Sequence, residues 1–197
     1  MSSSRRDAES EPLSDAELEA FTVGEVKPLN ATITLGEYDP NWPAHFAREN
    51  RRIRAALGET ALRVEHVGST SVPGLAAKPI IDTLLVVPNS ADEPSYVPKL
   101  EAAGYVLRIR EPDWFEHRVF KGPDTDVNLH VFSIGSPEID RMVGFRDWLR
   151  ANPSDRDYYL ATKRELAGQT WRHVQHYTDA KTAVVEEIIA RANAERM

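Results

Sequence analysis

Apolar and polar positions follow three successive patterns along the chain. Residues 1–11 carry almost no apolar side chain, which is typical of disorder. Residues 13–21 predict one short amphipathic helix, with Ser14 as cap and Glu17 three residues on. After a linker at residues 24–30, the apolar positions become dense. We therefore expect an N-terminal extension at residues 1–30 and one domain at residues 31–197.

The next pattern is a helix followed by two strands. Asp-Pro-Asn-Trp-Pro at residues 39–43 supplies a cap and a proline in the first turn, which predicts a helix that ends at Gly58. Residues 62–67 alternate as a half-buried strand does. Residues 79–87 form an almost unbroken apolar run, which is typical of a strand in the middle of a sheet.

Beyond these strands the pattern returns to helices. Residues 96–103 predict a helix, and three strand candidates follow at residues 105–110, 114–121 and 127–134. From Pro137 onward, apolar positions recur with helical spacing, and Asn152-Pro153 begins a further helix. This order predicts an α+β fold in which helices pack against one sheet, rather than a run of βαβ units.

Composition narrows the class of protein. The 197 residues have a formal charge of −7, which argues against general nucleic-acid binding, because that requires a large basic surface. There is no cysteine, so disulfides and thiolate zinc sites are excluded. No apolar run approaches the roughly twenty residues that span a bilayer. We expect a cytoplasmic protein that does not enter membranes.

Candidate chemistry gathers between residues 63 and 87. Gly68-Ser69-Thr70-Ser71 follows a strand and offers backbone amides and hydroxyls to a phosphate, although the same residues also suit a generic loop. Asp82 lies inside an apolar strand, where a charge needs a metal or a partner. Lys78 could contact phosphates, pair with Asp82 or lie at the surface.

A later pair of strands offers further polar side chains. On residues 127–132, Asn128 and His130 share one face, and His130 could ligate a metal, act as a base or be a hydrogen-bonded core histidine. His117 and Arg118 on the neighbouring strand could contact phosphate oxygens. Of Glu65 and its neighbour His66, only one can point toward Asp82.

Several basic residues of the C-terminal helices have a simpler explanation. Salt bridges at the surface account for them adequately, and no site is assigned to Arg146, Arg150, Lys163 or Arg164.

Together these segments resemble the GrpB family of small bacterial proteins, which is placed in the nucleotidyltransferase superfamily. The similarity covers roughly residues 31–192 and is carried by EHVGSTSVPGLAAKPIIDTLLVV at 65–87, EHRVFKG at 116–122, NLHVF at 128–132, FRDWLRANP at 145–153 and YTDAK at 177–181. The resemblance implies a small mixed sheet of the polymerase-β nucleotidyltransferase type. It also implies that Gly68-Ser69 holds a nucleoside triphosphate and that Asp82 holds Mg²⁺.

One position departs from the superfamily pattern. Active members usually carry a second acid two residues after the first, and here that residue is Leu84. His130 or Asn128 stands where a third acid commonly lies, and Glu65 is a candidate substitute as a metal ligand.

Three hypotheses follow. In the first, the protein is an enzyme that moves a nucleotidyl group to an unknown acceptor. Ser69, Gly68, Thr70 and Ser71 bind phosphates, Asp82, His130 and Glu65 hold the metal, and Lys78, His117 and Arg118 neutralise charge. In the second, the same cleft is a non-catalytic nucleotide or coenzyme sensor. In the third, His130 and Asp82 hydrolyse a small metabolite.

Overall fold

One mixed β-sheet forms the centre of the protein. The structure is a computed structural model that describes residues 12–195, so the disorder predicted for residues 1–11 lies outside the described residues. The strand order is β1-β2-β5-β4-β3, and the only parallel pair among the described strands is β2 with β5. The strands are β1 Arg63–Val67, β2 Ile81–Val87, β3 Val106–Glu111, β4 His117–Lys121 and β5 Val127–Ser133. The predicted α+β class is confirmed.

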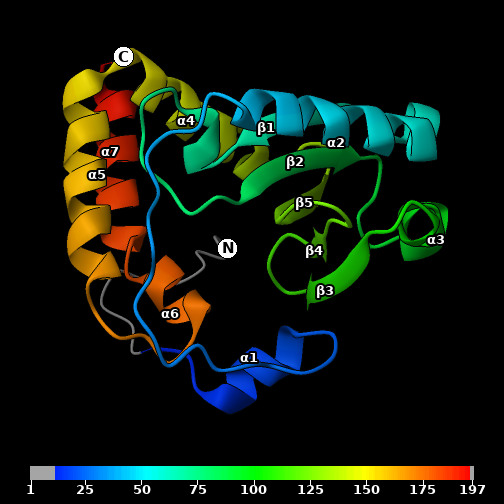
Figure 1. Cartoon of the computed structure of the whole chain (residues 1–197). Coiled ribbons are helices and arrows are strands. Elements are labelled where there is room, and N and C mark those ends of the chain that lie inside the picture. Colours follow the sequence, from blue (N-terminus) through cyan, green and yellow to red (C-terminus); the bar gives the residue numbers. More distant parts are fainter. Residues whose placement is uncertain (1–11, 196–197) are drawn as a thin grey trace.

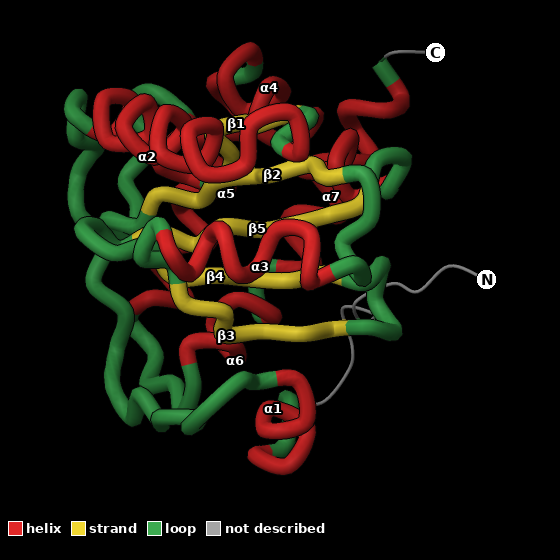
Figure 2. The backbone as a smooth tube through the Cα atoms, turned by 90° about the vertical axis from the view of Figure 1, so that its right-hand side faces the viewer, coloured by secondary structure: helices red, strands yellow, loops and turns green. Residues whose placement is uncertain are grey.

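Two groups of helices cover the two faces of this sheet. One face carries α2 (Trp42–Leu57) and α3 (Glu93–Ala102), which lie in front of the strands in Figure 2. The other face carries α4 (Pro137–Ala151), α5 (Pro153–Ala167) and α7 (Thr182–Ala194), with the short α6 (Val174–Asp179) near its lower edge (Figure 1). The sheet is therefore the middle of three layers.

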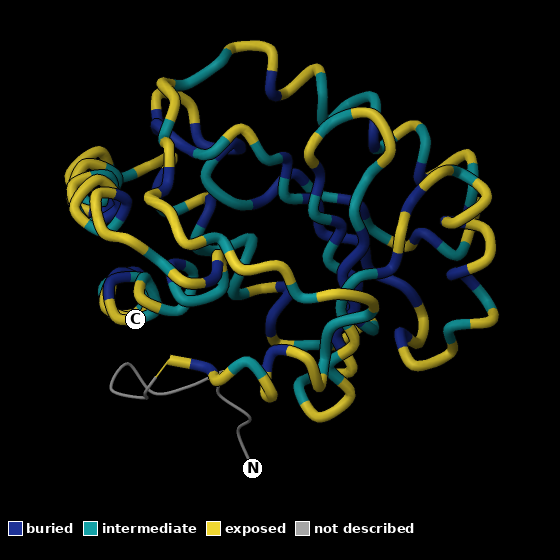
Figure 3. The backbone as a smooth tube through the Cα atoms, turned by 60° about the horizontal axis from the view of Figure 1, so that its bottom comes forward, coloured by how far each residue is buried: buried dark blue, intermediate teal, exposed yellow. Residues whose placement is uncertain are grey.

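Strand residues alternate between these two layers. Leu85, Leu129 and Val131 are fully buried against α2 and α3, whereas Leu84 and Phe132 are fully buried on the side of α4. Figure 3 shows the buried stretches of chain running through the interior, with exposed loops around them. Because β2 has helices on both sides, almost every position in it is apolar, as its sequence indicated.

Helix starts follow the predicted signals. Helices α2, α4 and α5 each have proline in the first turn, where the missing backbone N–H would have no partner in any case. The six-residue α6 was not predicted, because it is too short to show a helical period.

The described part of the N-terminal extension packs on the domain. Helix α1 (Asp15–Phe21) has the predicted capping box of Ser14 and Glu17, and it buries Leu18. Asp15 contacts His173 Nε2 at 3.0 Å, and the Leu29 amide donates to the Arg172 carbonyl at 2.6 Å. The division between residues 1–30 and 31–197 stays a prediction. Among residues 12–195, no helix has the length and apolar character that crossing a membrane requires.

Candidate functional site

The predicted phosphate loop lies directly against the predicted metal ligand. Strands β1 and β2 pair with Val67 opposite Asp82, so the turn that leaves β1 begins beside that carboxylate. Gly68 has φ +69°, and a Cβ at this position would collide with the Asp82 side chain. Only glycine therefore allows both the left-handed turn and the close approach. The structure thus brings Gly68, Ser69 and Asp82 together.

The other two hydroxyls of the loop hold the loop itself. Thr70 Oγ1 donates to the Ile80 carbonyl at 3.0 Å and lies 3.1 Å from His66 Nε2. Ser71 Oγ donates to the Gly68 carbonyl at 2.5 Å. Burial lowers the pKa of His66 to about 4, so its imidazole is neutral and its Nε2–H can donate to Thr70. Thr70 and Ser71 were predicted to bind phosphate, and in this structure their hydroxyls shape the turn.

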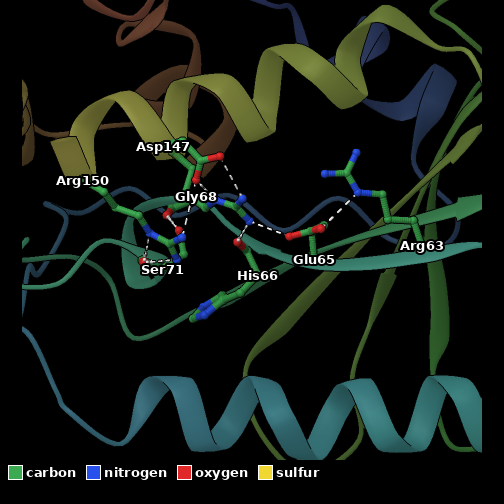
Figure 4. Close-up of polar contacts among 8 residues, drawn as sticks. Arg63, Glu65, His66, Gly68, Ser71, Asp147 and Arg150 are labelled. Carbon is green, nitrogen blue, oxygen red and sulfur yellow. Dashed lines mark hydrogen bonds and ion pairs between the residues drawn. The ribbon is translucent and has the colours of Figure 1, made fainter. Parts of the chain in front are cut away.

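Two arginines of α4 donate hydrogen bonds to the backbone at the two ends of the Gly68–Ser71 turn. Arg150 donates from Nε and Nη2 to the Ser71 carbonyl, at 3.0 and 2.7 Å, and Arg146 donates to the His66 carbonyl at 2.9 Å. Figure 4 shows this cluster between α4 and β1, with Glu65 and Asp147 completing it. Both arginines, which the sequence had assigned to surface salt bridges, therefore fix the loop's backbone.

Asp82 is an ionised carboxylate in a polar corner of the sheet. Asn128 Nδ2 donates to its Oδ1 at 2.9 Å, and His130 Nε2 lies 3.8 Å from the same oxygen. Burial alone raises the pKa of Asp82, but His130, Asn128 and Lys78 outweigh that effect, and the net shift is downward. The parallel register of β2 and β5 produces this corner by setting Asp82 opposite Asn128.

A chain of side chains extends from Asp82 across β5 and β4. His130 Nδ1 lies 3.1 Å from His117 Nε2, and His117 Nδ1 lies 2.6 Å from Glu111 Oε2. If Glu111 is ionised and His117 is neutral, His117 carries its proton on Nδ1, and its Nε2 accepts a hydrogen bond from His130 Nδ1–H. When His130 is protonated, its Nε2–H faces Asp82 and lowers the pKa of that carboxyl group. When His130 is neutral with its proton on Nδ1, the lone pair of Nε2 can accept a proton or bind a metal.

A cavity of about 210 Å³ opens over this corner. Its wall includes Gly68, Ser69, Asp82 and His130 from the sheet, and it is closed by residues from the helical layer. Three lysines line it: Lys78 before β2, Lys163 on α5 and Lys181 before α7.

Tyr177 lies beside these lysines. Lys78 Nζ and Lys181 Nζ lie 5.5 and 4.6 Å from the centre of its ring. Its buried hydroxyl has no hydrogen-bond partner within residues 12–195.

The lysines are held where their charge is unfavourable. Lys163 is 2% exposed, and burial together with the charge of Lys181 lowers its pKa to about 7. Burial and the charge of Lys78 lower the pKa of Lys181 to about 8, and the pKa of Lys78 is also lowered, mainly by burial. A polyanion in this cavity would offset the mutual repulsion of these positive charges.

The family model described as GrpB protein matches residues 32–191. The chain belongs to the GrpB family. It is 70% identical to a UPF0157 protein of Halalkalibacterium halodurans over 94% of this chain and 95% of that one. The crystal structure of the conserved protein GrpB from Enterococcus faecalis has a TM-score of 0.71 and 30% identity, covering 83% of this chain and 99% of that one.

A weaker structural similarity reaches a nucleotidyltransferase. The Cid1 poly(U) polymerase bound to Mg and 3′-dATP has a TM-score of 0.49 and 10% identity, over 69% of this chain and 44% of that one. The assignment of the family rests on the GrpB matches alone.

Four residues predicted for this GrpB site do not line the cavity: Glu65, Ser71, His117 and Arg118. Arg118 points to the opposite face of the sheet, where its Nε donates to Glu93 of α3 at 2.7 Å. Neighbouring residues of a strand face opposite ways, so His117 and Arg118 cannot both line one cavity, and the expectation that they do is wrong. Glu65 is on the face of Asp82 but pairs with Arg146 at 2.7 Å and with Arg63 at 3.0 Å. It supports the loop and does not line the cavity.

In this GrpB protein, a core residue stands at the position where the second acid was expected. Leu84 is fully buried against Val86 and Phe132. Across residues 12–195, no group of three or more histidines or acids is arranged to hold a metal. Among the described residues that line the cavity, Asp82 is the one acid and His130 the one histidine.

Sequence reasoning missed Lys163, Lys181 and Tyr177. Lys163 is on an amphipathic helix, where a lysine usually faces solvent, and its position within the helical stripe was the available signal. Lys181 and Tyr177 belong to the YTDAK segment that carried the family resemblance, and a role for that segment could have been suspected.

Proposed function

We propose that this GrpB protein binds a nucleoside triphosphate with Mg²⁺ and transfers its nucleotidyl group to a small-molecule or protein acceptor. The observation that carries the proposal is the 210 Å³ cavity in which the Gly68-Ser69 loop and Asp82 face three lysines. Phosphate groups need closely approaching backbone and fixed cations, and the cavity supplies both.

Different residues of the cavity would bind the phosphates, hold the metal ion and accept the proton. Lys78, Lys163 and Lys181 bind the phosphates, and Ser69 with Gly68 contacts them from the loop. The ionised Asp82 fits Mg²⁺, which usually takes one or two protein carboxylates and completes its shell with phosphate oxygens and water. When bound, the ion would neutralise charge that develops on the phosphates. His130, at the edge of the cavity, accepts the proton of the attacking group.

The transfer needs no reactant other than the nucleoside triphosphate and the acceptor. An acceptor oxygen forms a bond to the α-phosphorus, the bond from that phosphorus to the bridging oxygen of the β-phosphate breaks, and pyrophosphate leaves with its electrons. The proton of the acceptor hydroxyl passes to His130 Nε2, which has a lone pair available in the tautomer described above.

A second candidate is a sensor that binds the nucleotide without turnover. The buried Leu84 favours it, because two-metal catalysis normally uses a second carboxylate at that position. Such a sensor would bind the nucleotide in the cavity lined by Lys78, Lys163 and Lys181 (the lysine cavity). Its affinity for the nucleotide would not depend on Asp82.

Pyrophosphate release separates these candidates. The four ribonucleoside triphosphates are tested with and without Mg²⁺ for binding and for pyrophosphate, using the wild type and the Asp82→Asn and Ser69→Ala variants. Transfer predicts Mg²⁺-dependent pyrophosphate that Asp82→Asn abolishes. Binding without pyrophosphate, unchanged in Asp82→Asn, supports the sensor. Hydrolysis of a small phosphate ester in the absence of any triphosphate supports the hydrolase hypothesis, and no binding of any triphosphate refutes the proposal.

The remaining expectations about partners stay predictions. The net charge of −7 argues against nucleic acid as the acceptor, and cytoplasmic placement is the environment in which a nucleoside triphosphate would be available.

A further inference from the structure

A second cavity adjoins the lysine cavity on the far side of His130. It has a volume of about 440 Å³ and lies over β4, β5 and the first turns of α4 and α7. His130, Met142, Thr178 and Lys181 line both cavities, so the two spaces meet at the proposed base. A volume of this size suits a small organic molecule.

One wall of the second cavity is aromatic. Trp114 packs edge-on against Phe115, His117 and Phe132, with ring centres 5.7, 5.0 and 5.6 Å apart. These rings come from the segment after β3 and from β4 and β5. Aromatic faces attract cations and the flat surfaces of organic molecules.

The opposite wall is acidic, in contrast to the lysine cavity. Glu138, Asp179 and Glu186 line it together with Arg141 and Lys181, so one negative charge is unbalanced. Arg141 is engaged with Glu138 and Glu186. Asp179 Oδ1 accepts from Gln175 at 2.8 Å, but its buried Oδ2 has no hydrogen-bond partner in the part of the chain that the structure describes.

That unpartnered oxygen calls for a donor from outside the chain. A buried carboxylate oxygen without a partner is costly, and a ligand donor is one way to satisfy it. A protonated amine satisfies both the charge and the hydrogen bond, and it is attracted by the neighbouring aromatic wall.

The position of the cavity decides which substrate it takes. In-line displacement places the attacking oxygen and the leaving pyrophosphate on opposite sides of the α-phosphorus. The lysines and the Gly68-Ser69 loop hold the phosphates on one side of His130, so the attacking hydroxyl comes from the other side. That side is the second cavity.

We propose that the second cavity binds the acceptor and that the acceptor is a small organic cation that carries a protonated amine and a hydroxyl group. The ammonium group contacts Asp179, the organic body packs on Trp114, and the hydroxyl meets His130 at the junction. The role of this molecule as acceptor rests on the proposed nucleotidyl transfer. The unbalanced negative charge disfavours a triphosphate in this cavity.

Matched pairs of probes test the charge requirement. Tyramine is compared with tyrosol, and glucosamine with glucose, because each pair differs chiefly in an amine replaced by a hydroxyl. Binding is measured by saturation-transfer NMR and by calorimetry on the full chain, with and without Mg²⁺ and ATP. We expect the amines to bind about tenfold or more tightly than their neutral partners, since a charged hydrogen bond is gained.

Variants then locate the binding. Asp179→Asn keeps the shape and the contact with Gln175, and we expect it to reduce amine binding about tenfold or more while leaving ATP binding unchanged. Glu187→Gln is the matched control, because this carboxylate on α7 is engaged with Tyr158 and Arg191, at 2.9 and 2.8 Å, away from the cavity. It should bind amines as the wild type does.

The outcomes separate this proposal from the proposed function. Equal binding of amines and neutral partners, or amine binding that Asp179→Asn leaves intact, overturns the acceptor assignment even if triphosphate turnover is found. Competition between ATP and tyramine, with ATP weakened by Asp179→Asn, overturns it in favour of a nucleobase in this cavity. Asp179-dependent amine binding in a protein that binds no triphosphate refutes the transfer and supports the amine site.

Discussion

The two faces of the sheet use charge in opposite ways. On the α2 and α3 face, each buried charge described has a protein partner: Arg118 pairs with Glu93, and the fully buried Glu49 accepts from Tyr105 and Arg52. On the α4 to α7 face, Lys78, Lys163 and Lys181 gather around one cavity. Burial and the charges of Lys181 and Lys78 lower the pKa of Lys163, and burial and the charge of Lys78 lower the pKa of Lys181. A charge whose partner is in the protein stabilises the fold, whereas charges that crowd together are kept for a ligand.

The comparison is tested most strongly by removing a lysine from the cavity. Lys163→Met should weaken triphosphate binding about 100-fold, equivalent to about 2.8 kcal/mol, because a buried cation next to phosphate is lost. The same change should alter the free energy of unfolding little, because removing a buried charge with like neighbours offsets the loss of the hydrogen bond that Lys163 Nζ donates to the Ala76 carbonyl at 2.6 Å. Calorimetry and urea denaturation measure the two effects.

Lys99→Met is the control for this change, since Lys99 is an exposed residue on α3. It should alter neither quantity. Weaker folding with unchanged triphosphate affinity in Lys163→Met would show that Lys163 is a structural residue.

The opposite result is expected for the arginine on the other face. Arg118→Ala should lower the free energy of unfolding by about 2 kcal/mol, because, among the described residues, Glu93 keeps only Arg110 as a partner and the carbonyls of Glu116 and His117 lose the donor that Arg118 supplies. Triphosphate affinity should stay within about twofold of the wild type, since the side chain points away from the cavity. Denaturation and calorimetry on one preparation compare the effects, and a large loss of affinity in a folded variant would contradict the assignment of faces.

The pH dependence should also differ between folding and binding. Lys163 and Lys181 have pKa values of about 7 and about 8, and binding requires their protonated forms. Triphosphate affinity should therefore fall by about tenfold or more between pH 7 and pH 9. Over the same interval the unfolded chain, with ordinary lysines, binds more protons than the native one, so these two groups make stability rise with pH.

Calorimetry and denaturation across this interval measure both trends. Lys163→Met should show a shallower decline in affinity, because it lacks one of the two titrating groups. An affinity that is constant from pH 7 to pH 9 would contradict the role of the lysines.

The smallest effect on triphosphate affinity is expected for Arg150, which holds the Gly68–Ser71 turn. Arg150→Lys keeps the charge but cannot donate from Nε and Nη2 to the Ser71 carbonyl together. Triphosphate affinity should fall about threefold, because the loop is less well fixed. Arg156→Lys on α5 is a control that keeps the loop contacts, and equal affinities in both variants would show that the loop needs no such support.

Much of the fold was predictable because its signals are local. Alternation gave the strands, and proline in the first turn gave the starts of α2 and α5. Gly68-Ser69 and Asp82 were assigned to one site on the family resemblance, and their contact follows because the turn that leaves β1 lies next to β2. The period of two residues should have shown that His117 and Arg118 face opposite ways, and neither lines the cavity over Asp82.

The rest of the site depends on which helix packs over the sheet. Lys163 lies 81 positions after Asp82 in the sequence, and the helical pattern does not tell whether a lysine at that position faces solvent or a cavity. The second cavity depends in the same way on α4 and α7 meeting over β5. Such long-range packing leaves no local trace in the sequence.

The contacts of Arg146 and Arg150 also set an order of events during synthesis. All five strands are complete by Ser133, whereas the guanidinium groups that hold the Gly68–Ser71 turn come from residues 146 and 150. As the chain leaves the ribosome, the sheet can pair before the carbonyls of His66 and Ser71 meet their donors. A chain that ended before α4 would contain all five strand segments, but its Gly68–Ser71 turn would lack these donors.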